Sequence, residues 1–488
     1  MINPLTAQSA ELHEQLIAWR RHMHAHPELS GQEQQTAQFV ADELRKLGYS
    51  PRERVGGGFG VVADLSINGQ PPKIALRADM DALPIHEETG LPHASQNPGV
   101  MHACGHDAHT AMLLGAARLL AARRGELRQG VRLIFQPHEE VYPGGAPQMI
   151  ADGALEGIDS IFGIHIASQL ALGTLGTKPG PFMAAINQID VTIRGRGGHA
   201  AMPEQCIDPV VVAAQIIVAL QSVVSRSIAM TDAAVVSVTK VDAGTADNII
   251  PDFVKLGGTI RTFDERVRER VCKRVREVVV GTAQANGATA DVTLHPGYPV
   301  LVNDDAMTRR AFDAAAKLGF SDERIQTLPL QGGGEDFAYY CQKIPGTFVF
   351  LGARNEQKNC IYPHHHPRFD IDEDALPWGA ALYAHTALSA GSSDDSASAA
   401  VRERPSRRGP LPDAGPLFAV PVSQSTAAAS EPPAARRGRR TRRDAPANAA
   451  SVGSQDCPRC AGRLRGAHCK LVCDNCGYRE DCTDLFAQ

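Results

Sequence analysis

The chain has 488 residues, of which 43% are hydrophobic and 21% are charged, and its formal net charge is −5. These values are ordinary for a soluble globular protein and argue against a protein that binds nucleic acid or a membrane surface over its whole length. No apolar run has the length expected of a membrane-spanning helix, and the N-terminus lacks the basic start and apolar core of a secretion signal. The sequence therefore predicts a cytoplasmic protein that is long enough for more than one domain.

Helical and strand patterns alternate over about residues 8–388. Apolar residues recur at helical spacing in two N-terminal segments and in a segment between two strands, and short apolar runs indicate the strands themselves. The predicted helices cover residues 10–24, 33–48 and 107–124, and the predicted strands cover residues 59–67, 73–79 and 131–137. This alternation favours an α/β fold in which helices cover a sheet.

A second unit of the same kind is predicted at residues 187–298. Its strands and helices follow one another in the order β-α-β-β-α-β, the split-βαβ or ferredoxin-like pattern, which is compact enough for a small inserted domain. We therefore predict a main domain formed by residues 1–186 and 299–388, with the inserted domain between its two parts.

The ends of the predicted strands carry side chains that bind metals. Cys104 and His106 come just before a helix, and Glu139 and Glu140 directly follow a strand. Further imidazoles are supplied by His165, His364, His365 and His366. Ligands in open α/β sheets collect beyond the carboxyl ends of the strands, and a buried strand rarely ends in two carboxylates without cations to compensate them. Thiolate, imidazole and carboxylate together suit divalent transition metals.

Nine motifs follow one another in the order seen in the M20 metallopeptidase family, which the chain resembles over about residues 8–388. They are RADMDALP, CGHDAHTAMLLGAA, FQPHEE, GIHI, GRGGHAAMP, ADNIIPD, GTIRTF, GGGEDFAYY and HHHPRFD. The resemblance is to the amidohydrolase branch, which includes hippurate hydrolases, N-acyl-amino-acid hydrolases and auxin-conjugate hydrolases. Each motif alone is weak evidence, but nine in order are highly specific.

The resemblance implies a catalytic domain that binds two divalent metal ions and an inserted lid domain that usually dimerises. Carried over motif by motif, it assigns as metal ligands Cys104, His106, Glu140, His165 and His365. Cys104 would bridge the two ions as a thiolate, and His365 is selected because the family's ligand stands two residues before the proline. The ligand types suit zinc, and the resemblance also allows manganese, nickel or cobalt.

The same resemblance implies roles in catalysis. Glu139 matches the family's general base, which takes a proton from water and gives it to the leaving amine, and Asp81 is expected to orient a ligand. In the inserted domain, His199 resembles a histidine that stabilises the oxyanion, commonly in the partner's site of a dimer. Asn248 and Arg261 resemble residues that hold the substrate, and Arg261 suits a carboxylate through two parallel hydrogen bonds.

The expected reaction is metal-dependent hydrolysis of the amide bond of N-acyl amino acids, hippurate-like or N-acetyl, by a homo-oligomer. The alternative enzyme is an aminopeptidase or dipeptidase. Asp79 argues against that alternative, because peptidase relatives carry a ligand histidine at this position. His138 and Tyr142 depart from the family's usual Pro-Ala-Glu-Glu followed by glycines, and we expect them to narrow the pocket. Packing or orienting roles are expected for His102, His109, His364 and His366, and no role for Cys206, Cys272, Cys341 and Cys360.

The C-terminal part of the chain differs in composition. Residues 389–454 are rich in Ala, Pro, Ser and Arg and predict a disordered linker. Residues 455–488 have the cysteine spacing of a structural zinc ribbon, with the predicted ligands Cys457, Cys460, Cys473 and Cys476. The basic block at residues 436–443 is interpreted as a solubilising spacer. The alternative is a regulatory protein that binds nucleic acid through this block and the ribbon.

Overall fold

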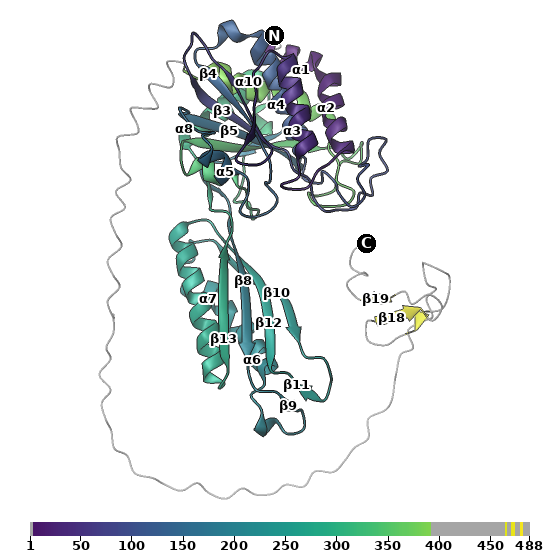
Figure 1. Ribbon diagram of the computed structural model, residues 1–488, viewed down its shortest axis with the longest axis vertical. Coiled ribbons are helices and arrows are strands. Elements are labelled where there is room, and N and C mark those ends of the chain that lie inside the picture. The colour runs from purple at the N-terminus through teal and green to yellow at the C-terminus, as the bar shows by residue number, and fades with distance from the viewer. Residues whose placement is uncertain (1–2, 392–463, 466–469, 474–478, 482–488) are drawn as a thin grey trace, which may run out of the picture. The chain divides into compact units, whose positions relative to one another are not determined.

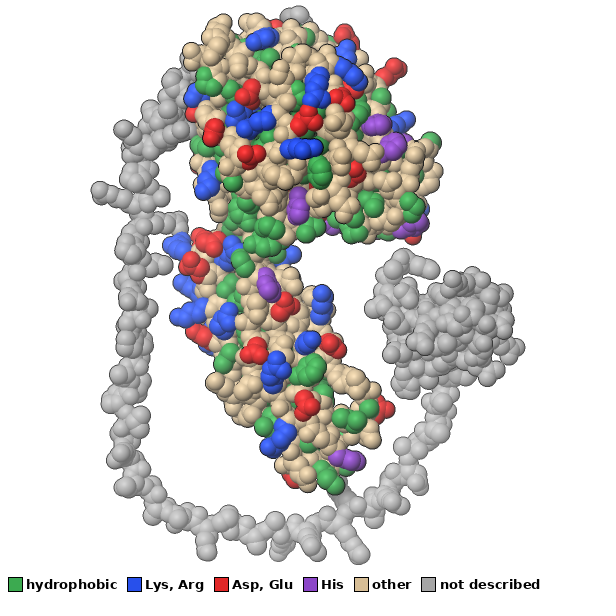
Figure 2. All heavy atoms as spheres, viewed as in Figure 1, with side chains coloured by type: hydrophobic (Ala, Val, Ile, Leu, Met, Phe, Trp, Pro, Cys, Tyr) green, Lys and Arg blue, Asp and Glu red, His purple; other side chains and the backbone are tan. Residues whose placement is uncertain are grey.

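The computed structural model describes residues 3–391 and, near the C-terminus, the backbone of residues 464–465, 470–473 and 479–481. The chain divides into two compact units, Met1–Ser406 and Arg407–Gln488, and each is described by itself. Within the first unit, Figure 1 shows two sheets, each with its own helices. Charged side chains of both signs are interspersed over the face drawn in Figure 2, in keeping with the small net charge.

The larger sheet has eight strands in the order β1-β2-β4-β3-β5-β16-β6-β15. Its four central strands, β4, β3, β5 and β16, are parallel, and β2 and β6 join them as antiparallel neighbours. The strands are β1 (Arg52–Val55), β2 (Gly60–Leu65), β3 (Pro72–Asp79), β4 (Gly130–Gln136), β5 (Ser160–Ala171), β6 (Leu175–Thr177), β15 (Ile325–Thr327) and β16 (Gly346–Arg354).

Helices cover both faces of this sheet, as the continuous apolar runs of its central strands require. They are α1 (Pro4–Glu11), α2 (His13–Ala25), α3 (Gln34–Lys46), α4 (His106–Ala122), α5 (Ala146–Ala151), α8 (Asp305–Leu318), α9 (Phe337–Cys341) and α10 (Leu376–Ser389). Successive strand residues point to opposite faces. Leu133 therefore joins the core that contains α4 and α10, while Ile134 joins the core that contains α5 and α9.

The first predicted helix is in fact two helices. The Asn3 side chain accepts a hydrogen bond from the backbone N–H of Leu5 and caps α1, so the helical structure begins earlier than residue 10. The N–H of Leu12 donates to the carbonyl of Ser9 at 3.1 Å, and this tighter turn separates α1 from α2.

The smaller sheet is antiparallel, with the order β10-β12-β8-β13. Its strands are β8 (Ala185–Arg194), β10 (Ala234–Ala243), β12 (Phe253–Thr262) and β13 (Thr289–Pro296), and its helices are α6 (Pro209–Ser227) and α7 (Glu265–Ala285). Burial alternates along β8, and the buried face packs with α6 and α7 in a separate hydrophobic core. Along the chain the elements run β8, α6, β10, β12, α7, β13. The boundaries 187–298 of an inserted domain stay a prediction.

Short strand pairs complete the described structure. In the first unit β9 (Gly198–His199) pairs with β11 (Ile249–Ile250), and β7 (Gly180–Met183) pairs with β14 (Leu301–Asn303). In the second unit β17 (Leu464–Arg465), β18 (Lys470–Cys473) and β19 (Arg479–Asp481) form a three-stranded sheet. Cys473 ends β18, whereas Cys457, Cys460, Cys476 and most of the predicted linker lie outside the described residues.

Helix α6 corrects one expectation. By length and composition, Pro209–Ser227 is long and apolar enough to cross a membrane, whereas no such run is predicted from the sequence. Val212, Ile216 and Leu220 pack in the core of the smaller sheet. However, only 28% of the most apolar 18-residue stretch of the helix is buried, and Val218 is 73% exposed. Apolar residues thus surround the helix instead of forming one stripe, and this raises its hydropathy. Core helices of soluble proteins can have the same length and composition, so these two properties alone do not identify a membrane span.

Candidate active site

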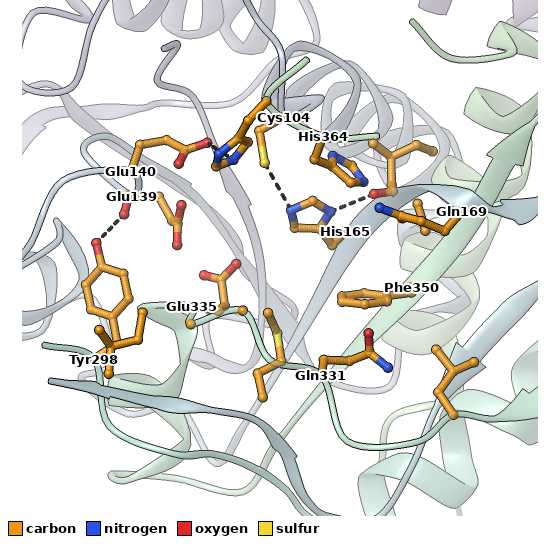
Figure 3. A pocket seen from close by; sticks show the side chains of 18 of the residues that line it. Cys104, Glu139, Glu140, His165, Gln169, Tyr298, Gln331, Glu335, Phe350 and His364 are labelled. Carbon is orange, nitrogen blue, oxygen red and sulfur yellow. Dashed lines mark hydrogen bonds and ion pairs between the residues drawn. The ribbon is translucent and has the colours of Figure 1, made fainter. Parts of the chain in front are cut away.

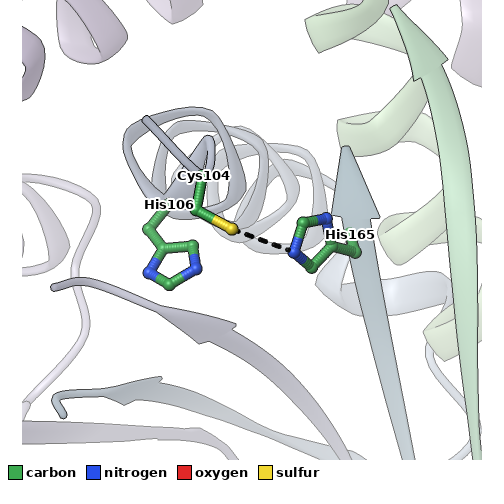
Figure 4. A group of neighbouring side chains, drawn as sticks. All are labelled: Cys104, His106 and His165. Carbon is green, nitrogen blue, oxygen red and sulfur yellow. Dashed lines mark hydrogen bonds between the residues drawn. The ribbon is translucent and has the colours of Figure 1, made fainter. Parts of the chain in front are cut away.

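Cys104 and His106 flank a glycine turn beside the larger sheet. Gly105 has a φ of +89°, and a Cβ at this position would clash with the side chain of Ile166 in β5. Glycine meets both demands, because it adopts positive φ without strain and lets the backbone approach closely. His106 is the first residue of α4, one position further into the helix than predicted. In Figure 4 the thiol of Cys104 lies between the imidazoles of His106 and His165.

Asp81 joins three parts of the site through its buried carboxylate. It accepts hydrogen bonds from Nδ1 of His106 at 3.2 Å, from the backbone N–H of Glu140 at 2.9 Å and from the hydroxyl of Ser30 at 2.6 Å. Because Nδ1 of His106 donates to Asp81, its Nε2 is the atom left to bind a metal. This arrangement agrees with the orienting role expected for Asp81.

His109 is tied at both ring nitrogens. Its Nδ1 donates to Asp79 at 2.5 Å, and its Nε2 accepts from the backbone N–H of Ile166 at 2.7 Å. Asp79 in turn accepts from the guanidinium of Arg77 at 2.7 Å. Burial opposes ionisation of Asp79, but His106, His109 and Arg77 outweigh burial and hold its pKa well below the usual range. Both hydrogen bonds of His109 are used within the protein, which suits the packing or orienting role expected for it.

The loop that carries Glu139 and Glu140 directly follows β4. The preceding residue, His138, has a φ of +62°, and its backbone N–H donates to the fully buried carboxylate of Glu33 at 2.8 Å. A non-glycine residue with positive φ persists where its surroundings hold it in place. Glu33 therefore helps to hold the backbone conformation just before Glu139 and Glu140.

The predicted histidine ligands from β5 and the C-terminal loop face the same group of side chains. Nδ1 of His165 donates to the carbonyl of Ile166 at 2.6 Å, and its Nε2 lies 3.6 Å from Sγ of Cys104. Nε2 of His365 lies 3.5 Å from Oε1 of Glu140. Burial lowers the pKa of His165 well below its usual value and so favours the neutral imidazole that binds metals.

His364 lies beside His165 but is held differently from its neighbour His365. Its ring centroid is 5.1 Å from that of His165, and its Nε2 accepts a hydrogen bond from the backbone N–H of Ser168 at 3.4 Å. Burial lowers the pKa of His364 to about 3. His366 stacks on Tyr362, with ring centroids 4.7 Å apart.

Five predicted ligands fall into two groups that share Cys104. Cys104, His106 and His165 form one group, and Cys104, Glu140 and His365 form the other; within each group the ligand atoms lie within 4.8 Å of one another. Nε2 of His106 and Oε1 of Glu140 are buried and have no hydrogen-bond partner among the described residues. Unpaired buried polar atoms are costly, and two metal ions at these positions would satisfy them.

The crowding of acidic groups in the site also favours bound metal ions. Burial, followed by Glu140 and Glu139, raises the pKa of the Cys104 thiol well above its ordinary value. Burial, followed by Glu335 and Glu140, likewise raises the pKa of Glu139. Divalent cations would offset this crowding of negative charge and stabilise the thiolate. The donor set therefore fits divalent metal ions.

Glu335 and Asp336 have no role among the predictions from the sequence, although both belong to the motif GGGEDFAYY. Both are buried, and together with Glu139 they form a further acidic group. The guanidinium of Arg77 pairs with Glu335 at 3.1 Å and with Asp336 at 2.7 Å. Burial raises the pKa of Glu335 to about 8, although Arg77 acts in the opposite direction. Two acidic residues between three glycines and the apolar helix α9 are the signal that could have identified them.

A cavity of about 670 Å³ opens over the site. Its lining includes the predicted residues Cys104, Glu139, Glu140, His165, His365 and Arg261. In Figure 3, Glu139 and Glu140 lie near Tyr298, whose hydroxyl donates to the backbone carbonyl of Glu139. Arg261 comes from β12 of the smaller sheet, and its Nε donates to the carbonyl of Gly332 at 3.1 Å. The larger and the smaller sheet of the first unit thus both contribute to the cavity.

His199 and Asn248 do not line this cavity among the described residues. The structure brings them to each other instead, because β9 pairs with β11 and the N–H of Ala200 donates to the carbonyl of Asn248 at 3.0 Å. Both residues are exposed. A role in catalysis would therefore need a second subunit or a different arrangement of the sheets.

His138 and Tyr142 do not narrow the pocket, which corrects the expectation from the sequence. Neither belongs to the described lining of the cavity. The positive φ of His138 turns its ring toward Gly31, where a Cβ would come within 3.3 Å of Nδ1. Tyr142 is 48% exposed, with its ring centroid 6.0 Å from that of Tyr298.

Comparison with known proteins identifies the family of the chain. Residues 75–389 match the model of peptidase family M20/M25/M40. The N-acetyl-L-cysteine deacetylase of Bacillus subtilis is 45% identical over 376 residues, which are 77% of this chain and 87% of that protein. Thermostable carboxypeptidase 1 of Saccharolobus solfataricus is 40% identical over 390 residues, which are 80% of this chain and 98% of that protein.

A solved structure extends the similarity to three dimensions. The YXEP protein of Bacillus subtilis, described as a dinuclear metal binding peptidase from the M20 family, has a TM-score of 0.67 and 41% sequence identity. The match covers 78% of this chain and 98% of that one. The chain belongs to peptidase family M20/M25/M40. This membership, together with groups of side chains suited to holding a metal ion, makes it a metal-dependent amidohydrolase.

Proposed function

We propose that the protein hydrolyses the amide bond of N-acyl amino acids and releases a carboxylic acid and a free amino acid. The observation that carries the proposal is one cavity whose lining includes Glu139, Arg261 and four of the five predicted ligands, Cys104, Glu140, His165 and His365. Such a cavity suits a substrate with an amide at one point and a carboxylate at another. The similarity to a deacetylase of N-acetyl-L-cysteine supports the same class of substrate.

Two divalent metal ions are the proposed cofactors. Their ligands would be Cys104, His106, Glu140, His165 and His365, with Cys104 common to both groups. Bound cations of this kind lower the pKa of a water molecule and polarise a carbonyl group. Thiolate and imidazole favour zinc, and manganese, nickel and cobalt remain allowed.

The protein's own residues would handle the proton and the substrate. Glu139, which is outside the five-ligand set, takes the proton of the attacking water and passes it to the leaving nitrogen. Arg261 binds the carboxylate of the amino acid, and Asp81 fixes the ring of His106. The oxygen of the water bonds to the acyl carbon and the C–N bond breaks. One proton of the water ends on the nitrogen of the released amino acid, so the reaction balances.

A substrate panel tests the proposal. We expect the metal-reconstituted enzyme to cleave N-acetyl and N-benzoyl derivatives of one amino acid and to leave the free dipeptide intact. The amide of the same acyl amino acid lacks the carboxylate that Arg261 would bind, so its kcat/KM should fall by at least about tenfold. Amino acid release measured by chromatography gives each rate. Turnover of free dipeptides alone would replace the proposal with a peptidase, the alternative that the similarity to a carboxypeptidase keeps in view.

A homodimer that shares residues between its sites is the proposed assembly. His199 and Asn248 are exposed and do not reach the described cavity, and α6 exposes the apolar side chains of Val210, Val211 and Val218. Apolar surface of this kind is typical of an interface. We therefore propose that the smaller sheet and its helices form a lid and dimerisation domain, and that His199 stabilises the oxyanion in the partner's site.

Subunit mixing tests this arrangement. Glu139→Gln and His199→Ala should each be inactive alone, because each destroys every site of its own homodimer. When the two variants are mixed and exchange subunits, about half of the dimers contain one subunit of each kind. Each mixed dimer has one intact site out of two, so the mixture should recover about a quarter of wild-type activity. Activity of His199→Ala by itself would remove His199 from the mechanism. An exchanged mixture with no activity would place His199 in its own subunit's site.

The C-terminal proposals rest on the sequence alone. A structural zinc ion bound by Cys457, Cys460, Cys473 and Cys476, and nucleic-acid binding through this part of the chain, stay predictions. Localisation in the cytoplasm also stays a prediction.

A further inference from the structure

Phe350 is more exposed than its neighbours in the central strand β16. In β16, residues 346–353 are buried except for Phe350, which is half-buried. A central strand that is covered on both faces normally buries all of its side chains, so the exposed part of Phe350 marks where the cavity opens. Its register partner in β5 is His165, which is half-buried between buried neighbours in the same way.

The ring of Phe350 is held next to this predicted ligand. Its centroid lies 5.6 Å from that of His165 and 5.2 Å from that of Phe182, which is fully buried behind it. Phe350 also lines the cavity. A substrate bound at the metal-binding groups would therefore have an aromatic surface beside it.

Apolar side chains form much of the lining of the cavity to which Phe350 belongs. Its other lining side chains include Ile166, Ala167, Leu170, Met183, Leu328 and Pro329. In Figure 3, Glu139, Glu140 and Tyr298 lie at one end of the cavity, while Phe350 lies at the other end with Gln169 and Gln331. An apolar group bound at the second end would remove apolar surface from water.

The position of Glu139 decides which half of the substrate lies there. In the proposed reaction Glu139 gives a proton to the leaving nitrogen, so the nitrogen faces Glu139 and the acyl substituent points away from it. We propose that Phe350 is a specificity-determining residue that selects bulky apolar acyl groups over acetyl. This inference rests on the proposed function. An acetyl group is too small to cover Phe350 and the wall around it in a cavity of about 670 Å³.

Replacement of Phe350 provides the test. The wild-type enzyme should cleave the N-benzoyl derivative of an amino acid with a higher kcat/KM than the N-acetyl derivative of the same amino acid. In Phe350→Ala the kcat/KM for the benzoyl substrate should fall by about tenfold or more, while that for the acetyl substrate changes by less than about threefold. Phe350→Leu keeps apolar volume without the ring, so it should fold like wild type and give an intermediate loss.

Leu330→Ala is the matched control. Leu330 is 38% exposed and lies between Pro329 and Gln331, which line the cavity, but it is not itself part of the described lining. This variant should keep the wild-type preference. Equal losses on both substrates in Phe350→Ala would overturn the inference, because they would show that Phe350 supports His165 instead of the acyl group.

The outcomes also separate this inference from the proposed function. Cleavage of acetyl substrates with no preference for benzoyl would overturn the role of Phe350 and leave the proposed function standing. Failure to cleave either acylated substrate would overturn both.

Discussion

Glu139→Gln should lower kcat by about 10³-fold or more while both metal ions remain bound, because general acid–base catalysis supplies 10²–10⁴-fold. The substitution keeps the size of the side chain and removes its capacity to carry a proton. Glu139 is buried and lies outside the five-ligand set, and its backbone carbonyl, which accepts from Tyr298, is unchanged by the substitution. Initial rates and metal content measured on the same preparation give both quantities.

Glu88→Gln is the control for this substitution. It makes the same carboxylate-to-amide change on an exposed residue and should leave kcat unchanged. Loss of metal in Glu139→Gln, in proportion to the loss of activity, would assign Glu139 a ligand role instead. Full activity with metal bound would exclude it as the general base.

Cys104→Ala should lower the metal content to one ion per chain or fewer and reduce kcat/KM by about 10²-fold or more. The reason is geometric: Cys104 belongs to both groups of ligand atoms, so its removal affects both ions. Treatment of the wild-type enzyme with a chelator should likewise abolish activity, and addition of zinc or manganese should restore it. The metal that restores the highest rate identifies the preferred ion.

Cys341→Ala provides the comparison for Cys104. This free cysteine ends α9 and belongs to no metal-binding group among the described residues. It should keep its metals and its activity. Two ions and a normal rate in Cys104→Ala would contradict the shared-ligand arrangement.

The positions of the predicted metal ligands relative to helices and strands were easier to predict from the sequence than the side chains that contact them. Glu139 and Glu140 follow the end of β4 and Cys104 lies just before α4, and such places, where an apolar run begins or ends, can be predicted from one sequence. His365 could be separated from its neighbours only by resemblance, because three adjacent histidines look alike in composition. The structure distinguishes them by contact, since Nε2 of His365 lies near Glu140 and Nε2 of His364 is used by Ser168.

Contacts between distant parts of the chain could not be predicted in this way. Arg77 pairs with Asp336, which lies 259 positions further along the chain, and Glu33 accepts from the backbone of His138. No local pattern reveals such partners, because they depend on which strands become neighbours in the sheet. The error over Tyr142 has a similar cause: its position after the glutamates is visible in the sequence, but whether its side chain reaches the cavity is not.

The hydrogen bonds of Ser30 and Glu33 also bear on where the catalytic unit begins. The family match starts at residue 75, yet Ser30 donates to Asp81, and Glu33 fixes the backbone at His138, from well before that point. A fragment cut at the start of the match would retain every predicted metal ligand and Asp81, but it would lose Ser30 and Glu33, which support Asp81 and the backbone at His138. The segment by which the family is recognised is therefore shorter than the segment that can work as an enzyme, and a transplant or minimal version of the protein should include the N-terminal helices.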